Sequence, residues 1–192
     1  SMIGDELDQA VNCSRYSRES AKYIESRGKS GDIVFVGQAL RGEDCAKRST
    51  PAYFGNIKSL ALRLDKKGVP VVLFDGTYPP SRLPELCSKE VWRPFPSPSD
   101  CQKPSSAAKN AYSTFDLMAE RLHENVRNVF YAPLRMGLCV DGTCGQNTRL
   151  GTSIWHDNGH ITERASGELS GLLRRRLLSQ GFYVYINASK RR

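Results

Sequence analysis

Three short runs of apolar residues predict buried strands. The runs cover residues 33–36, 69–74 and 129–131. They are nearly continuous in apolar side chains, which is typical of strands buried on both faces of a sheet. Turn-forming or small residues follow each run, namely Gly37, Asp75-Gly76 and Ala132-Pro133. The sequence therefore predicts an internal sheet whose strands end at these positions.

Helical patterns, with apolar residues three and four positions apart, separate the runs. They predict helices over residues 14–27, 52–67, 106–125 and 163–179. The apolar side of the first helix would consist of Tyr16, Ala21, Tyr23 and Ile24. Thr162 and Gly181 are suitable caps for the last helix. Residues 182–186 are aromatic and β-branched, so they predict a final edge strand.

This alternation of strands and helices predicts an α/β fold, a three-layer sandwich with a parallel sheet flanked by helices. Active sites in such folds lie beyond the carboxyl ends of the strands. The segments that would reach this edge are 37–45, 75–105 and 132–160. Asp75 ends the central strand, where it either lines a site or forms a plain turn.

Composition supports one folded domain over residues 1–192. Hydrophobic residues make up 39% and charged residues 25% of the chain, as in ordinary globular proteins. No stretch approaches the roughly 18 to 20 apolar residues of a membrane span. We therefore expect a domain that does not insert into a membrane. It remains open whether that domain is a fragment of a larger membrane protein.

The formal net charge is +8, but the basic residues are scattered. Dense runs occur at Arg174–Arg176 and Lys190–Arg192. The first run points in several directions around a helix, which indicates surface charge rather than a binding surface. No aromatic and basic motif of an RNA-binding module is present, so we do not expect a nucleic-acid partner.

The six cysteines favour an oxidising compartment. Loop lengths favour pairing of neighbours in the sequence, which gives Cys139 with Cys144, Cys87 with Cys101, and Cys13 with Cys45. Reduced thiols and a zinc site are the alternatives, although the chain has no C-x-x-C pair. We expect no metal and no cofactor. Asn12 and Asn187 begin sequons, which fit a secretory route.

The segment Trp155-His156-Asp157-Asn158-Gly159-His160-Ile161-Thr162 precedes the last predicted helix. Asp157 stands three residues before His160, so its carboxylate can reach the imidazole, fix the tautomer and stabilise the imidazolium. His160 would then act as a general base. The alternative is a polar turn that only caps a helix. Trp155 and Trp92 predict either a sugar-stacking platform or core packing.

Together these features resemble the SGNH (GDSL-like) hydrolase family, most closely the extracytoplasmic SGNH domains fused to membrane O-acyltransferases. The resemblance covers roughly residues 29–180. It is carried by segments 29–37 and 67–73, by the cysteine pairs in 87–101 and 139–144, and by 155–162. It implies a Ser–His–Asp site for carbohydrate O-acetyl transfer or acetyl-ester hydrolysis, with Asp157 and His160 as the Asp and His. The partners it implies are an acetylated glycan or polysaccharide and a membrane acyltransferase domain in the same chain.

The nucleophile departs from the family pattern. In Gly4-Asp5-Glu6, Glu6 stands where the family has serine. The oxyanion Asn is also missing, and Gly37 and Gln38 are the candidates at that position. Three explanations stay open: a nucleophile strand upstream, a degenerate member that keeps a ligand groove, or a substituted nucleophile. The function is therefore either an acetyltransferase or acetylesterase, or a non-catalytic module that binds a glycan or a partner. In both cases we expect an extracytoplasmic location.

Overall fold

The computed structural model describes residues 16–37, 50–75, 102–145, 147–156 and 160–185. Its centre is a parallel sheet of three strands in the order β1-β2-β4. The strands are β1 (Val34–Gly37), β2 (Val71–Phe74) and β4 (Val129–Tyr131). Val71 pairs with both Val34 and Val129, so the three strands are in register and end at one edge. The predicted α/β architecture with a parallel sheet is confirmed.

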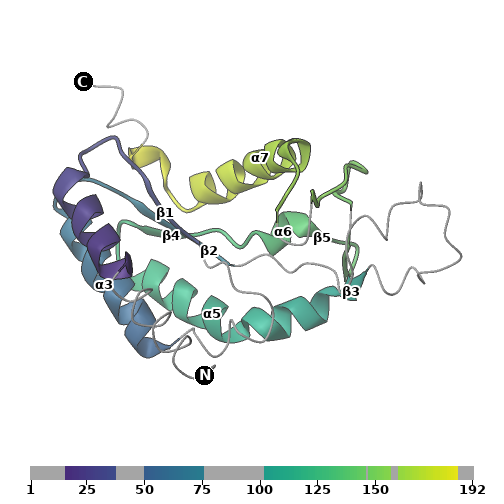
Figure 1. The fold of residues 1–192 in the computed structure, drawn as a ribbon, viewed down its shortest axis with the longest axis horizontal. Coiled ribbons are helices and arrows are strands. Elements are labelled where there is room, and N and C mark those ends of the chain that lie inside the picture. Colours follow the sequence, from purple (N-terminus) through teal and green to yellow (C-terminus); the bar gives the residue numbers. More distant parts are fainter. Residues whose placement is uncertain (1–15, 38–49, 76–101, 146, 157–159, 186–192) are drawn as a thin grey trace, which may run out of the picture.

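Helices cover both faces of this sheet (Figure 1). One face packs against α3 (Pro51–Asp65) and α5 (Ser105–Asn125), and a helix over residues 16–27 adds Ala21 and Ile24 to that core. The other face packs against α7 (Glu163–Ser179). The residue ranges of these helices match the four predicted ones closely, because each helix buries at least part of its apolar stripe.

The helix boundaries follow from capping. The Thr50 hydroxyl accepts from the Tyr53 amide (3.2 Å) ahead of α3, and Gly68, with φ +69°, follows that helix. At α7, the Thr162 hydroxyl accepts from the Ala165 amide (3.2 Å). Gly181, with φ +87°, reverses the chain after α7. The predicted caps of α7 are therefore the observed ones.

Two predictions at the edges of the fold are wrong. Residues 182–185 form a helical turn, not an edge strand, because the reversal at Gly181 folds Phe182 back onto Phe130 with ring centroids 4.8 Å apart. Tyr16 and Tyr23 are exposed, so only Ala21 and Ile24 form the buried side of the first helix.

A second, smaller sheet and a short helix lie beyond the end of β4 (Figure 1). The chain passes from β4 into α6 (Arg135–Leu138) and then into β5 (Cys139–Val140) and β6 (Thr143–Cys144). These antiparallel strands pair with β3 (Lys103–Pro104) in the order β3-β6-β5. Their brevity explains why the sequence pattern did not predict them.

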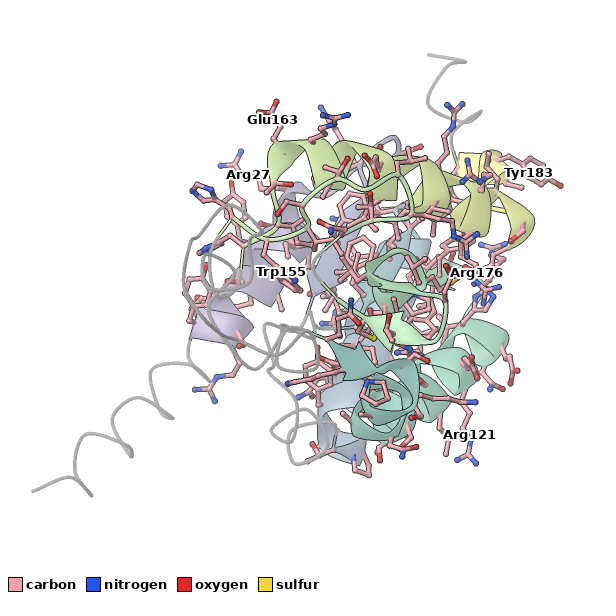
Figure 2. The ribbon with its side chains drawn as sticks, turned by 90° about the vertical axis from the view of Figure 1, so that its right-hand side faces the viewer. Arg27, Arg121, Trp155, Glu163, Arg176 and Tyr183 are labelled. Atoms are coloured by element: carbon pink, nitrogen blue, oxygen red, sulfur yellow. A yellow bond between two sulfur atoms is a disulfide. The ribbon has the colours of Figure 1, made fainter. Side chains whose placement is uncertain are left out.

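Charged side chains project from many separate elements. Figure 2 shows Arg27, Arg121 and Glu163 pointing outward from three different helices. Among the helices described here, none combines the length and the apolar character needed to cross a membrane.

Candidate functional site

The loop ahead of α7 carries the predicted base, His160. The His156 amide donates to the His160 carbonyl oxygen (2.8 Å), which joins the two sides of the loop. Thr162 closes it, because its amide donates to the Ile154 carbonyl oxygen (2.7 Å) and its hydroxyl to the Ser153 carbonyl oxygen (2.6 Å). The His160 side chain is exposed. The loop therefore presents His160 at the surface directly before the helix cap.

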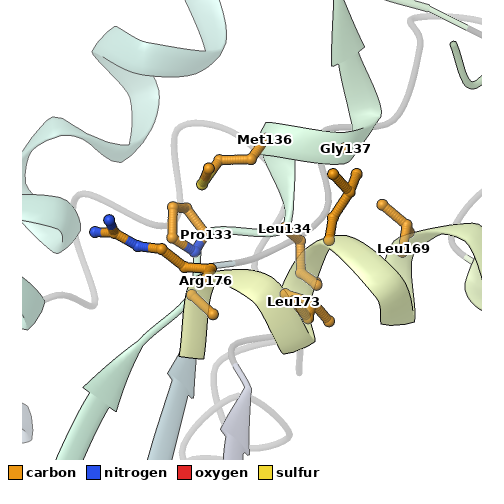
Figure 3. Close-up of a pocket in the computed structure, with 9 residues that line it drawn as sticks. Pro133, Leu134, Met136, Gly137, Leu169, Leu173 and Arg176 are labelled. Atoms are coloured by element: carbon orange, nitrogen blue, oxygen red, sulfur yellow. The ribbon is translucent and has the colours of Figure 1, made fainter. Parts of the chain in front are cut away.

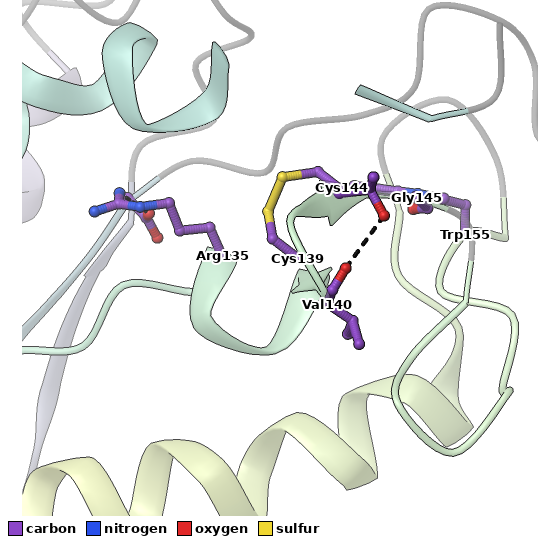
Figure 4. The surroundings of a disulfide bond; sticks show 8 residues. Arg135, Cys139, Val140, Cys144, Gly145 and Trp155 are labelled. Carbon is purple, nitrogen blue, oxygen red and sulfur yellow. Dashed lines mark hydrogen bonds and ion pairs between the residues drawn. A yellow bond between two sulfur atoms is a disulfide. The ribbon is translucent and has the colours of Figure 1, made fainter. Parts of the chain in front are cut away.

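A disulfide hairpin supports this loop (Figure 4). Cys139 and Cys144 are joined by a disulfide across β5 and β6, and the left-handed residues Asp141 and Gly142 make the turn. The Trp155 indole donates to the Gly145 carbonyl oxygen (3.2 Å), one residue after Cys144. The hairpin and the His160 loop are thus tied together.

Trp155 is a packing residue and not a sugar-stacking platform. Only 4% of its surface is exposed, and it belongs to a buried cluster with Leu138, Ile154 and Leu169. Its burial follows from its role in holding the loop onto α6 and α7. Trp92, the other tryptophan considered for stacking, lies outside the described residues.

The loop lies beyond the carboxyl edge of the parallel sheet. The second half of α7 covers the sheet, because Leu177 packs with Val72 and Phe130. The first half of α7 instead packs on α6, which follows the end of β4. Gly37 ends β1 at the same edge, opposite Phe74. This edge is where ligand sites of such sheets form.

A buried cluster of charged groups occupies the same edge. Arg135 Nη1 donates to Asp75 Oδ2 (2.6 Å), and Nη1 and Nη2 donate to the two Asp116 oxygens (2.8 and 2.5 Å). The Tyr131 hydroxyl also donates to Asp116 (2.6 Å). Asp75 accepts a further hydrogen bond from the Leu134 amide. The cluster therefore connects the end of β2, the middle of α5 and the start of α6.

Burial dominates the protonation of this cluster. Desolvation raises the pKa of Asp75 to about 7, although the Arg135 guanidinium and the Leu134 amide oppose the rise. Desolvation, followed by the nearby Asp75 carboxylate, also raises the pKa of Tyr131. Asp75 thus titrates near neutrality while it holds α6 in place.

Sequence reasoning found one member of this cluster and missed the others. Asp75 was visible as a polar residue at the end of a buried strand. Asp116 and Arg135 carried no signal, because a single charged residue in an amphipathic helix or in a turn is ordinary. Only the packing of α5 and α6 against the strand ends brings them together.

Several predicted site residues lie outside the described residues. These are Glu6, Gln38 and Asp157, together with the cysteine pairs Cys13 with Cys45 and Cys87 with Cys101. Their roles stay predictions. Within the described ranges, no group of three or more His, Cys, Asp or Glu side chains is arranged to hold a metal ion.

Residues 2–175 match the family model described as SGNH domain (fused to AT3 domains). No curated protein and no solved structure matches the chain significantly. The matched range contains the parallel sheet, the disulfide hairpin, the His160 loop and most of α7.

Proposed function

Because this chain belongs to the family of SGNH domains of the type fused to AT3 acyltransferase domains, we propose that it serves carbohydrate O-acetyl transfer or acetyl-ester hydrolysis. The observation that carries the proposal is the loop that presents His160 beyond the carboxyl edge of the sheet, ahead of α7. The family match includes this loop, and the disulfide hairpin supports it.

In the proposed chemistry, His160 is the general base. A hydroxyl oxygen bonds to the acyl carbonyl carbon while its proton passes to a ring nitrogen of His160. The alcohol of the ester then leaves with that proton. Water or a sugar hydroxyl attacks the new ester in the same way and restores the first hydroxyl. Asp157 would accept from the other ring nitrogen and hold the imidazole in the useful tautomer.

The nucleophilic hydroxyl is the part that this chain alters. Glu6 stands where the family resemblance places serine, and a carboxylate there cannot form the ester intermediate without making an anhydride. We therefore expect the chain as given to be a weak esterase or inactive.

Hydrolysis of p-nitrophenyl acetate by matched variants tests this proposal. Glu6→Ser should gain activity over the unaltered chain. Adding His160→Ala to Glu6→Ser should lower the rate of ester hydrolysis at least about a hundredfold, the usual contribution of a general base. Adding His156→Ala is the matched control, because it removes an exposed imidazole from the same loop, and it should keep the gain.

Two outcomes would contradict this assignment. If the unaltered chain already hydrolyses the ester and His160→Ala alone abolishes this, a different nucleophile exists and Glu6 is misplaced. If no variant is active while all are folded by circular dichroism, the chain is not a self-sufficient acyl-transfer domain.

Glu6 favours a second candidate function, a non-catalytic SGNH module. Such a module would bind an acetylated glycan or polysaccharide, or an acyltransferase domain in the same chain, at the same edge of the sheet. Binding of acetylated polysaccharide without turnover, lost on deacetylation of the polymer, would favour this function over the enzyme.

We place both functions outside the cytoplasm. The disulfide between Cys139 and Cys144 supports an oxidising compartment, where such bonds persist. The fusion of such domains to AT3 acyltransferase domains, which the family description names, also supports an extracytoplasmic location.

A further inference from the structure

A compact loop over residues 147–153 leads directly into the His160 loop. The residues at its two ends form an isolated antiparallel bridge. Inside it, the Thr148 amide donates to the Thr152 carbonyl oxygen (2.8 Å), and the Gly151 amide donates to the Thr148 carbonyl oxygen (2.9 Å). Both threonines are buried, with 8% and 9% of their surfaces exposed. The loop therefore has a defined backbone shape of its own.

Glu168 of α7 accepts hydrogen bonds from both threonine side chains of this loop. Its carboxylate accepts from the Thr152 hydroxyl and from the Thr148 hydroxyl. The Thr148 hydroxyl oxygen in turn accepts from the Leu150 amide (3.3 Å) and from the Thr152 amide (3.2 Å). A hydroxyl has one proton and two lone pairs, so Thr148 uses its whole hydrogen-bonding capacity here. The hydrogen bonds from Thr148 and Thr152 hold the pKa of Glu168 below its ordinary value, which keeps this acceptor ionised.

Two separate contacts thus join the chain ahead of His160 to the first half of α7. Thr162, at the cap of α7, holds the carbonyl oxygens of Ser153 and Ile154. Glu168 lies six residues further along, about 9 Å by the rise of a helix, and holds the preceding loop. A segment held at one point can rotate about that point, whereas a segment held at two separated points has a defined orientation. Glu168 supplies the second point.

We propose that Glu168 is a positioning residue for His160. The inference rests on the proposed function, in which His160 is the general base, and it identifies a residue that fixes where this base stands. In this role Glu168 transfers no proton. It holds the loop on α7, so that the imidazole keeps one place beyond the edge of the sheet. Precise placement matters, because a displacement of about 1 Å at a reacting group can lower a rate about a hundredfold.

The role depends on the acceptor oxygens of Glu168. Glu168→Leu would leave two buried hydroxyls without this partner, which costs free energy and releases the loop from α7. Glu168→Gln keeps an acceptor oxygen on a side chain of the same length. The glutamine variant should therefore preserve the position of His160, and the leucine variant should not.

Histidine NMR of the whole chain, without any ester, tests the geometry. Glu168→Leu should shift or broaden the ring signals of His160, because the loop loses its second attachment. Glu168→Gln should leave these signals close to those of the unaltered chain. Glu120→Leu is the matched control, because it makes the same change at an exposed glutamate of α5, and it should also leave them in place.

Kinetics in the Glu6→Ser chain test the consequence for catalysis. With p-nitrophenyl acetate, Glu168→Leu should lower kcat by about tenfold or more and change KM by less than about twofold, because it displaces the base rather than the ester. Glu168→Gln should keep most of the rate, and Glu120→Leu should keep all of it. Thr152→Val keeps the side-chain shape and removes one donor, so it should lower kcat to a smaller extent. It keeps the test valid if Glu168→Leu does not fold.

The outcomes separate this inference from the proposed function. Unchanged His160 signals in folded Glu168→Leu overturn the positioning role, and so does an equal loss of kcat in the leucine and glutamine variants. If the His160 signals move in Glu168→Leu but not in Glu120→Leu, while no variant hydrolyses the ester, Glu168 does position His160 and the proposed enzyme function is wrong.

Discussion

Among individual residues, Arg135 is held by charged and aromatic groups on several sides. It lies between two carboxylates, and Asp75, the more buried of them, is only 1% exposed. The same guanidinium also approaches the Tyr112 ring, with 5.9 Å from Cζ to the centroid. Removing one partner of a buried ion pair usually costs more than the pair itself contributes, because the other charge is left uncompensated.

Arg135→Gln should therefore lower the free energy of unfolding by about 3–5 kcal/mol, the range measured when one partner of a buried ion pair is removed. Urea unfolding followed by circular dichroism measures this. Arg121→Gln, an exposed arginine in α5, is the control and should change stability by less than about 0.5 kcal/mol. Equal losses of stability in the two variants would mean that the buried ion pairs of Arg135 stabilise the fold no more than an exposed arginine does.

Asp75 should make stability depend on pH in a defined direction. Its pKa in the folded chain is about 7, above the ordinary value of 3.8. Between these pH values the folded state binds more protons than the unfolded state, so stability falls as the pH rises. The contribution of Asp75 is complete below about pH 4 and is lost as the pH passes 7.

The comparison with Asp75→Asn isolates this effect. An amide does not titrate. Raising the pH from 4 to 8 should therefore lower the unfolding free energy of the unaltered chain by a few kcal/mol relative to that of Asp75→Asn. Urea titrations at several pH values measure the difference. A constant difference would show that Asp75 stays ionised throughout.

At the level of secondary-structure elements, α6 and α7 pack closely against each other at Gly137. A Cβ atom on Gly137 would lie 2.1 Å from Leu169 Cδ2 and 3.0 Å from Leu172 Cδ1. The backbone of α6 therefore rests directly on the leucine side chains of α7. The two helices leave only a small apolar pocket between them, lined by Gly137, Leu169 and Leu172 (Figure 3).

Gly137→Ala should lower the melting temperature, because the new methyl group must displace α6 or two leucines, at a cost of about 1–3 kcal/mol. Gly167→Ala is the control in α7, where nothing lies within 4 Å of the added Cβ. It should raise stability by up to about 1 kcal/mol through helix propensity. A neutral Gly137→Ala would show that α6 moves freely on α7.

In the molecule as a whole, the two faces of the sheet are covered differently. The face under α3 and α5 holds the larger core, including Leu64, Val71 and Phe115. The face under α7 is covered by its second half, which frees its first half to extend over α6. One helix thereby completes the fold and carries the His160 loop to the edge of the sheet (Figure 1).

The cysteines give a prediction for the complete chain. If Cys87 pairs with Cys101 and Cys13 with Cys45, as loop lengths favour, then denatured but unreduced protein should show almost no free thiols. Alkylation followed by intact-mass measurement counts them. Reduction before alkylation should expose six, the number of cysteines in the sequence. Six free thiols without reductant would contradict both the pairing and the oxidising compartment.

Local sequence patterns were enough to predict the strands, the main helices and the α7 caps. These depend on local periodicity, on hydroxyl capping at Thr162 and on the left-handed freedom of Gly181, which neighbouring residues decide. The sequence also marked two candidate residues: His160, through its spacing from Asp157 ahead of a predicted helix, and Asp75, as a polar residue at the end of a buried strand.

The contacts that these residues make depend instead on how distant parts of the chain pack together. Arg135 joins Asp75 to Asp116 through contacts between residues far apart in the chain, and Trp155 turns inward because the disulfide hairpin offers its indole an acceptor. Residues 182–185 form a helical turn where the local pattern predicts a strand, because this turn places Phe182 against Phe130 in a buried cluster. Such contacts depend on how whole elements pack, and no local pattern encodes them.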